Sequence, residues 1–505
     1  MDAIRKVDQP ASSWRWLALG SILLFFSYGA NNIALAAWLA PVFLLRFVRK
    51  ARWRVWMPVL YVIQVAAVAF QLRGMVPLPG MGYCLFLAVS GIQALIPYAV
   101  DRGLARRVGG LPSTLVFPCA WTVLDYLNSY GPYGSWGAEA YSQYGNLPLL
   151  QILSVTGLWG VTFLIAWLAA VSNYVWEEGW NCRSARTAAG LCASTIVAVI
   201  LLGGLRITLF PPSSPTVRIA SLSRRHVGVH PGKDSWDRLL RNQATASDLA
   251  VIRNWAAAVD DDLLARAEHE AQGGAKVVFW GEGNADVFKD DEPALLVRGS
   301  ELAAKYQIYL GMALATWNHG QAKPLENKLV LFAPNGQEAW QYYKAHPVPG
   351  VEAPISVTKD GKLRNLDTPF GRLSAVICFD ADFPQLLAQA GALRSDIVLA
   401  PSNDWRAIDP WHTQMASFRA IEQGVNLDRH TSDGLSAAFD YEGRVLSAMD
   451  HFHSGDYTMI ADVPTKGVRT IYSRWGDWFA WLNVAGLIGL AARGFLARRK
   501  RPPPS

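Results

Sequence analysis

Charged residues are scarce in this sequence of 505 residues. Asp, Glu, Lys and Arg together make up 17% of it, whereas a typical soluble domain carries about a quarter. Hydrophobic residues reach 51%, and 21 tryptophans are present. The composition therefore indicates a membrane protein, and at this length we expect more than one domain.

Cysteine is also rare. Four of the five cysteines lie in or beside apolar segments: Cys84, Cys119, Cys182 and Cys192. They have no paired spacing, which argues against a disulfide framework and a zinc site. The histidines that were considered as ligands, His412, His430, His451 and His453, have no regular metal spacing either. We expect neither a metal nor a cofactor, and Cys378 stands alone in the polar part of the chain.

Basic residues outnumber acidic ones, with a formal charge of +7 and a pI near 9.1. A nucleic-acid-binding protein would gather such residues on one folded face. Here they cluster beside the apolar runs, where membrane topology accounts for them. We therefore expect no nucleic-acid partner.

Long apolar runs fill the first part of the chain, and a spanning helix needs about 20 such residues. The eight candidate spans are centred near Leu23, Val42, Val62, Ala88, Val116, Trp159, Val197 and Leu487. About seven of them form a predicted membrane domain, residues 1–210, and the last is residues 475–496, followed by a basic cytoplasmic tail, residues 497–505. The SYGANN break at residues 27–32 leaves a six-span alternative with a re-entrant start.

The distribution of Lys and Arg predicts the orientation, because these charges are retained on the cytoplasmic side. With the N-terminus inside, the inside loops hold Arg46, Arg49, Lys50, Arg52, Arg54, Arg102, Arg106, Arg107, Arg183 and Arg186. The short outside loops hold only Arg73. Either span count then places the polar domain, residues 215–466, outside the cytoplasm.

This polar domain alternates short apolar runs with amphipathic stretches. The predicted strands are VRIASL, KVVFWGE, QIYLGMAL, NKLVLFAP, EAWQYY, RLSAVICF, DIVLAPSND, LSAAFD and TMIADV. Residues 243–271 and 411–424 are the amphipathic stretches between them. This order is typical of an α/β layered sandwich.

Three predicted strands end at groups that acyl-transfer chemistry uses: Glu282, Lys344 and Cys378. A thiol attacks a carbonyl effectively only as its thiolate, so it needs a base or a positive charge nearby. A glutamate can take the thiol proton, and a lysine can stabilise the oxyanion. A lone buried cysteine is more often an inert small hydrophobe, so spacing alone does not establish the site.

Several short sequence motifs resemble those of a known family. WGE at 280–282, YYKAHPVPGVE at 342–352, ICFDADFP at 377–384 and SNDW at 402–405 resemble, in this order, the carbon-nitrogen hydrolase (nitrilase) superfamily. LLQILSVTGLWGVTFL at 149–164 and GDWFAWL at 476–482 extend the resemblance to apolipoprotein N-acyltransferases, its membrane-integrated branch. The resemblance implies a nitrilase-like α-β-β-α sandwich outside the cytoplasm, beside a multi-span helical domain in a bacterial inner membrane.

The resemblance also implies roles for residues. Glu282 would be the general base, Lys344 the lysine at the oxyanion and Cys378 the nucleophile, with Glu352, Phe379 and Asp380 in support. The activity implied is transfer of an acyl chain from a phospholipid, through a cysteine thioester, to the N-terminal amine of a lipoprotein. The implied partners are therefore the membrane, a phospholipid donor and a lipoprotein or other amine acceptor.

The sequence departs from the family pattern at several points. Gly281 precedes the base glutamate where the family usually has proline, and Phe379 and Asp380 stand where it usually has Tyr and Glu. The segment VEAPISVTKDGKLRNLDTPF, between Lys344 and Cys378, is shorter and more polar than the family's apolar lid. A membrane-anchored amidase and an acyltransferase acting on a different amine therefore stay open, while a transporter or receptor would leave the ordered triad unexplained.

Overall fold

The computed structural model describes residues 11–499. The predicted basic tail from residue 500 onward, and Arg5 and Lys6 near the N-terminus, lie outside the described residues. The chain divides into two compact units: unit 1 joins Met1–Leu209 to Trp475–Ser505, and unit 2 is Phe210–Arg474. Unit 2 is thus inserted between two helices of unit 1.

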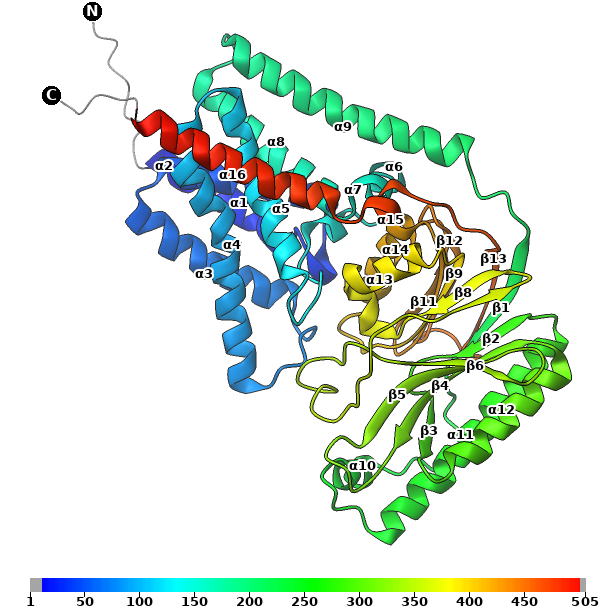
Figure 1. The fold of residues 1–505 in the computed structure, drawn as a ribbon. Helices are drawn as coiled ribbons and strands as arrows, with labels where there is room; N and C mark the ends of the chain where they lie inside the picture. Colours follow the sequence, from blue (N-terminus) through cyan, green and yellow to red (C-terminus); the bar gives the residue numbers. More distant parts are fainter. Residues whose placement is uncertain (1–10, 500–505) are drawn as a thin grey trace, which may run out of the picture. The chain divides into compact units, whose positions relative to one another are not determined.

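Unit 1 is helical in all of its described regular structure (Figure 1). Its α-helices are α1 (Ala11–Phe25), α2 (Ala34–Lys50), α3 (Trp53–Gln71), α4 (Gly80–Val108), α5 (Val116–Asn128), α6 (Leu147–Leu150), α7 (Leu153–Thr156), α8 (Trp159–Glu178), α9 (Arg183–Leu209) and α16 (Trp478–Arg499). Short 3-10 helices lie at Gly29–Asn31, Leu111–Leu115 and Glu139–Gln143. One buried charged pair lies inside the unit: the Arg49 guanidinium donates two 2.8 Å hydrogen bonds to Asp101.

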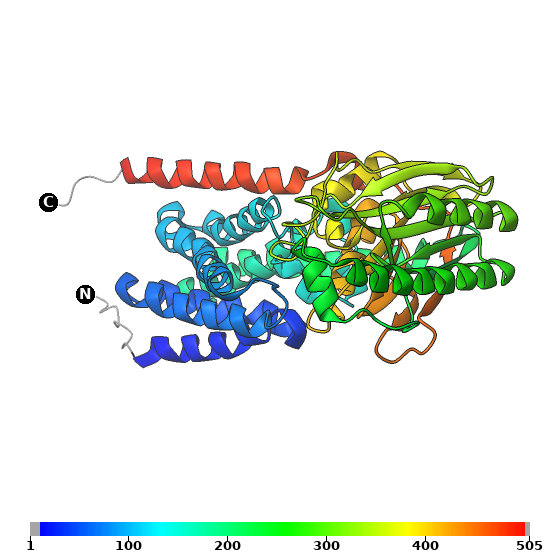
Figure 2. The same ribbon diagram turned by 90° about the horizontal axis from the view of Figure 1, so that it is seen from below.

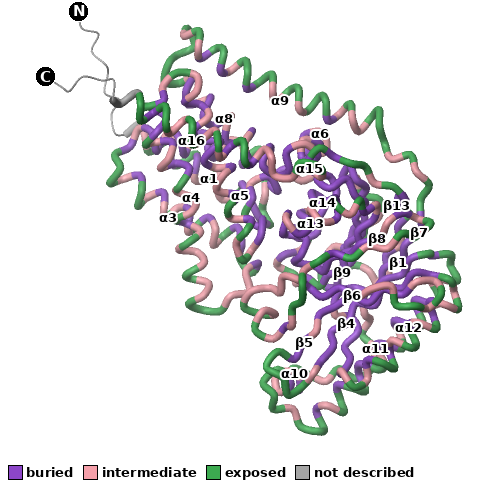
Figure 3. Tube along the Cα trace, in the orientation of Figure 1, coloured by how far each residue is buried: buried purple, intermediate pink, exposed green. Residues whose placement is uncertain are grey.

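Five described helices are long and apolar enough to cross a membrane: α3, α4, α8, α9 and residues Trp478–Leu496 of α16. They coincide with five of the eight predicted spans. The other three predicted spans correspond to α1, α2 and α5, which have 15, 17 and 13 residues. These are shorter than the roughly 20 residues that a span needs, so the count of eight stays a prediction. Figure 3 shows α9 exposed along most of its length, as expected of a helix that faces lipid.

Unit 2 contains two mixed β-sheets and the helices that cover them. Its strands are β1 (Thr216–Leu222), β2 (Val277–Trp280), β3 (Ala285–Phe288), β4 (Tyr309–Trp317), β5 (Leu325–Phe332), β6 (Glu338–Tyr343), β7 (Asn365–Thr368), β8 (Gly371–Ala375), β9 (Ile397–Asn403), β10 (Asn426–Ser432), β11 (Leu435–Phe439), β12 (Val445–Asp450) and β13 (Thr458–Pro464). Its α-helices are α10 (Lys233–Leu240), α11 (Ala246–Gln272), α12 (Glu292–Tyr306), α13 (Pro384–Ala392) and α14 (Trp411–Gln423), and α15 (Ile471–Trp475) ends it.

The first sheet has the order β13-β1-β2-β4-β5-β6, with β3 also pairing with β4, and the second has the order β12-β11-β10-β9-β8-β7. Helices α11 and α12 cover the first sheet, and α13 and α14 cover the second (Figures 1 and 2). Trp255, Val259 and Leu263 of α11 belong to one buried core with Val278 and Leu310 of the sheet. The predicted α-β-β-α sandwich is therefore confirmed.

The two sheets meet at a histidine. His430 of β10 is fully buried, and its ring nitrogens lie 2.9 and 2.8 Å from the hydroxyls of Ser221 and Ser223, on and just after β1. Its ring also contacts Phe279 of β2 edge-on. The layer between the sheets thus contains a polar contact inside an apolar surrounding.

Candidate active site

Lys344 directly follows β6, whose pairing with β5 places it inside the unit. Its backbone N–H donates to the carbonyl of Asn327 at 2.9 Å. Its ammonium donates to Glu282 Oε1 at 2.7 Å and to Glu352 Oε2 at 2.6 Å, and its side chain is only 2% exposed. Burial acts to lower the pKa of this lysine, but the two carboxylates outweigh it and raise the pKa well above its usual value. Lys344 is therefore a fixed positive charge.

Glu282 lies just after β2, and its two carboxylate oxygens differ. Oε1 accepts hydrogen bonds from Lys344 and, at 2.7 Å, from the Asn327 amide. Oε2 is buried and has no hydrogen-bond partner among the described residues. Burial and the charge of Glu352 raise the pKa of Glu282, although Lys344 acts in the opposite direction. The carboxylate is thus oriented through one oxygen while the other is left available to accept a proton.

Cys378 lies at a sharp turn after β8, where it begins a 3-10 helix, Cys378–Asp382. Its φ of +49° is in the left-handed region that non-glycine residues seldom adopt. The side chain is buried, and Sγ lies 3.7 Å from the carbonyl oxygen of Asn403. Burial and the charge of Glu282 raise the pKa of the thiol well above its usual value, against the effect of Lys344. The resting sulfur is therefore a thiol that needs a base.

The three predicted supporting residues differ in what they do. Glu352 binds the Lys344 ammonium and also accepts a 2.9 Å bond from the backbone N–H of Val348. Asp380 accepts from the Tyr342 hydroxyl at 2.7 Å and from the His346 backbone N–H at 2.8 Å.

Phe379, the third of them, is buried, and its ring packs edge-on against Phe383. The structure therefore brings Glu282, Lys344 and Glu352 into direct contact. Asp380 links neighbouring segments through hydrogen bonds, and Phe379 packs against an aromatic ring.

A cavity of ≈ 340 Å³ opens beside Glu282 within unit 2. Three tryptophans line it, Trp236, Trp255 and Trp317, together with both glutamates of the lysine contact. Arg224 and Asp286 also line it and form an ion pair at 3.2 Å. The site therefore has an aromatic, charge-bearing space next to Glu282.

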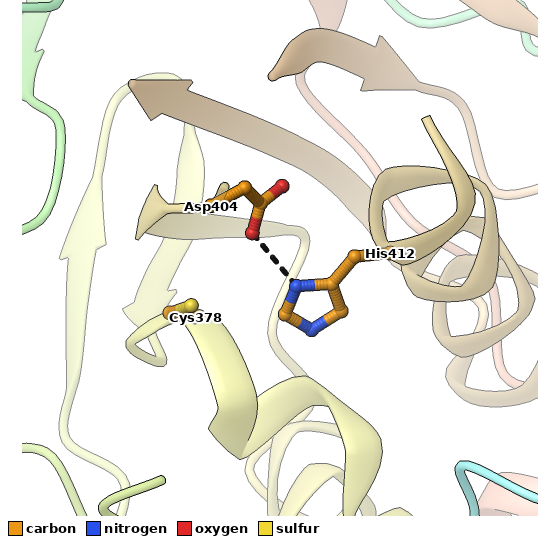
Figure 4. A group of neighbouring side chains, drawn as sticks. All are labelled: Cys378, Asp404 and His412. Carbon is orange, nitrogen blue, oxygen red and sulfur yellow. Dashed lines mark hydrogen bonds and ion pairs between the residues drawn. The ribbon is translucent and has the colours of Figure 1, made fainter. Parts of the chain in front are cut away.

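Some residues near Cys378 were not predicted from the sequence. Figure 4 shows Asp404 and His412 next to Cys378, and one ligand-type atom of each lies within 4.8 Å of the others. These atoms are already engaged, because His412 contacts Asp404 at 2.8 Å and Arg429 donates to both Asp404 oxygens. We interpret this group as a hydrogen-bonded charge network rather than a metal site.

Sequence spacing did not predict this network, because Cys378, Asp404, His412 and Arg429 belong to different elements and have no regular spacing. Asp404 belongs to the SNDW word, which was used only to support the resemblance. Asn327 was not predicted either, because it lies within a predicted strand and no motif marks it. Only the fold brings these side chains together.

Comparison with known proteins finds a family match in each of the two units. Residues 262–472 match the carbon-nitrogen hydrolase family, and residues 20–171 match the apolipoprotein N-acyltransferase N-terminal domain. The chain is similar to an apolipoprotein N-acyltransferase of Geobacter metallireducens, with 25% identity over 97% of this chain and 96% of that one. One of Bradyrhizobium diazoefficiens is 26% identical over 82% of this chain and 80% of its own.

Among solved structures, the chain is similar to an amidase from Nesterenkonia sp., at 17% identity and a TM-score of 0.40, over 54% of this chain and 97% of that chain. Both family matches occur here in one polypeptide, the first in unit 2 and the second in unit 1. The similarity to the Geobacter metallireducens protein extends over both units. The chain belongs to the apolipoprotein N-acyltransferase family.

Proposed function

We propose that this chain is an apolipoprotein N-acyltransferase that works through a thioester on Cys378. The observation that carries the proposal is the asymmetry of Glu282. Its Oε1 is held by Lys344 and Asn327, while Oε2 is buried without a hydrogen-bond partner among the described residues. A carboxylate held in this way next to a buried thiol is suited to move a proton to and from sulfur.

In the first half-reaction, Glu282 takes the proton of the Cys378 thiol, and the thiolate attacks an ester carbonyl of a phospholipid. The Lys344 ammonium stabilises the negative oxygen that forms. When the carbon–oxygen bond breaks, the leaving alkoxide takes the proton from Glu282. The products are a lysophospholipid and an acyl group bound to Sγ.

In the second half-reaction, the N-terminal amine of a lipoprotein attacks the thioester carbonyl. Glu282 takes a proton from the amine and returns it to Sγ as the carbon–sulfur bond breaks. An amide forms and the free thiol is restored, so protons and acyl groups balance over the cycle. Because Glu282 serves as base and then acid in each half, one carboxylate is sufficient.

Membrane attachment supports a lipid donor. Five described helices are long and apolar enough to span a bilayer, so the chain is a membrane protein and can meet phospholipid where it resides. We further propose that the membrane is the bacterial inner membrane and that unit 2 faces away from the cytoplasm, because Lys and Arg gather in alternate loops. The acceptor expected on that side is a lipoprotein rather than a nucleic acid.

Mass spectrometry of the purified protein tests the proposal directly. Incubation with phospholipid should add an acyl mass to Cys378, and a lipopeptide with a free N-terminus should then remove it as an amide. Cys378→Ala should form neither species, and Cys378→Ser should be very weak because a hydroxyl proton is far harder to remove. Release of the acyl group to water alone, with no amide formed, would indicate the amidase alternative. Full activity in Cys378→Ala would reject the covalent route.

The other two members of the triad should fail differently. Glu282→Gln keeps the shape and loses the base, which should cost about two to four orders of magnitude in rate. Lys344→Met should cost roughly a hundredfold to a thousandfold through loss of oxyanion stabilisation.

Lys328→Met is a matched control for the lysine, since Lys328 is also buried and pairs with the carboxylate of Glu326 at 2.7 Å. Both lysine variants should lose stability. Only Lys344→Met should lose rate per folded molecule.

A further inference from the structure

Four buried charged side chains adjoin the nucleophile and are not part of the triad. Asp382 ends the 3-10 helix that Cys378 begins, Asp404 directly follows β9, His412 lies in the first turn of α14 and Arg429 lies in β10. At most 6% of each residue is exposed. The Arg429 guanidinium binds Asp404 in a two-pronged contact of 2.9 and 2.8 Å. The four side chains therefore form a buried hydrogen-bonded network between the second sheet and helix α14.

The histidine in this network has a carboxylate at each ring nitrogen. His412 Nδ1 lies 2.8 Å from Asp404 Oδ1, and Nε2 lies 3.0 Å from Asp382 Oδ2. A neutral imidazole carries a proton on only one nitrogen, so with both carboxylates ionised the two contacts are hydrogen bonds together only when the ring is an imidazolium. Arg429 Nη2, 2.8 Å from Nδ1, then donates to Asp404 Oδ1 and not to the ring. Both distances together favour the charged ring.

The charges around the ring support the same state. Burial and Arg429, whose Nη2 lies 2.8 Å from Nδ1, act against a positive ring, but Asp382 and Asp404 outweigh them and raise the pKa of His412. When His412 is an imidazolium, it and Arg429 are two positive charges that balance the two carboxylates. A neutral ring would leave an excess negative charge buried next to the thiol, which is costly in such a setting.

His412 also connects the two segments that flank the sulfur. Through Asp382 it holds the 3-10 helix that carries Cys378, and through Asp404 it holds the end of β9. The preceding residue, Asn403, has its carbonyl oxygen 3.7 Å from Sγ. In Figure 4 the Cys378 side chain, Asp404 and His412 form one close group, with these atoms within 4.8 Å of one another.

We propose that His412 is a positioning residue for the nucleophile: as an imidazolium held between Asp382 and Asp404, it fixes the turn that carries Cys378 and provides a positive charge near Sγ when the thiol loses its proton. This inference rests on the proposed function and deepens it, since it assigns to the same sulfur a further positive charge besides those of Lys344 and Arg429. Lys344 approaches from the first sheet and His412 from the second sheet's helix. The thiolate would then be stabilised by cations from both layers.

The test measures the rate at which iodoacetamide alkylates Cys378 across a range of pH in the purified full-length protein. Cys84 and Cys182, the two cysteines that are not buried, are replaced by Ser, and Glu282→Gln removes the titration of that carboxyl. Alkylation reports the thiolate and needs no acyl transfer. Its outcome is therefore separate from success or failure of the proposed function.

His412→Gln keeps a neutral hydrogen-bonding group and removes the charge. At pH 6 to 7 the variant should be alkylated at least about tenfold more slowly than its parent, which corresponds to one unit in the pKa of the thiol. As pH rises and His412 loses its proton in the parent, the two rates should converge. A merely structural role would give a rate ratio that does not change with pH, and this result would overturn the proposal.

Two further measurements keep the test decisive. His453→Gln is the matched control, because this histidine is exposed and pairs with Asp450 away from the network; its rate ratio should stay near one. If the His412 variants, Gln and Asn, do not fold, the parent alone is informative. Its logarithmic rate should rise with pH, flatten while His412 deprotonates and then rise again, whereas a uniform unit slope would contradict a charged His412.

Discussion

Asn327 is a neutral side chain that helps to set the proton affinity of Glu282. Its amide donates a 2.7 Å bond to Oε1 and so favours the charged form. Asn327→Leu should therefore raise the pKa of Glu282 further, and the acid side of the pH profile of acyl transfer should move to higher pH. Initial rates between pH 5 and 9 would show this. Asn335→Ala, in the exposed turn between β5 and β6, is the control, and an unmoved acid limb in Asn327→Leu would contradict the assigned role of Glu282.

His430 makes the stability of unit 2 depend on pH. Burial lowers its pKa to about 3, from the usual 6.5. A histidine with a depressed pKa contributes stability above pH 6.5 and loses it as pH falls toward 3, because only the unfolded chain takes up the proton. At pH 5 the loss should be about 2 kcal/mol relative to pH 7.5.

Denaturant unfolding of the purified protein at the two pH values measures this loss. His430→Gln should reduce the difference, and His319→Gln, at an exposed position, should leave it unchanged. Equal pH dependence in the parent and in His430→Gln would show that another group is responsible.

At the level of single residues, the sequence predicted those site residues that lie within recognisable motifs. Glu282, Lys344 and Cys378 each end or follow a strand that the pattern predicts. The resemblance supplied their proposed roles and added Glu352. Asn327 and His412 could not be predicted in this way. Their importance arises from contacts between strands and helices distant in sequence, and neither residue type is unusual at its position.

Asp380 joins two elements, the end of β6 and the turn after β8. It receives hydrogen bonds from the Tyr342 hydroxyl and the His346 N–H on one side and, at 3.2 Å, from the Ile377 N–H on the other. Asp380→Ala would leave buried donors without a partner, which should cost about 3 kcal/mol. Asp380→Asn keeps one oxygen as an amide carbonyl that can still accept hydrogen bonds, so it should cost less.

Thermal unfolding and the rate of acyl loading check this prediction together. Both should fall in Asp380→Ala, because the brace holds the segment that carries Lys344 against the segment that carries Cys378. Asp367→Asn, on an exposed carboxylate of β7, is the control. Unchanged unfolding in Asp380→Ala would contradict the bracing role.

At the level of elements, the apolar strands were predicted and four others were missed: β3, β7, β10 and β12. β10 is the clearest case. Its sequence, NLDRHTS, is mostly polar, yet every residue in it is buried. The two Nη atoms of Arg429 and the ring of His430 contact partners on other elements, so the alternation of polar and apolar residues that marks a half-exposed strand is absent.

The orientation of the whole molecule in the membrane is a prediction that labelling can check. Lys362 is exposed in unit 2, so Lys362→Cys, with Cys84 and Cys182 replaced by Ser, should react with an impermeant thiol reagent added to intact cells whose outer barrier is opened. A reporter fused to the C-terminus should be cytoplasmic. The parent with the same serine replacements is the control, and labelling only after lysis would contradict the proposed side.

The pairing of β1 with β13 has a consequence for how the protein is made. Thr216 is opposite Pro464, and Leu222 is opposite Thr458, so the first strand of unit 2 needs the last one as its outer neighbour. A ribosome delivers these strands one after the other, and contacts between such distant segments form slowly. Until β13 has been synthesised, the edge of β1 has unpaired backbone groups that can pair with strands of other chains. The enzyme is therefore most prone to aggregation during translation, and this interval ends only shortly before the ribosome makes α16.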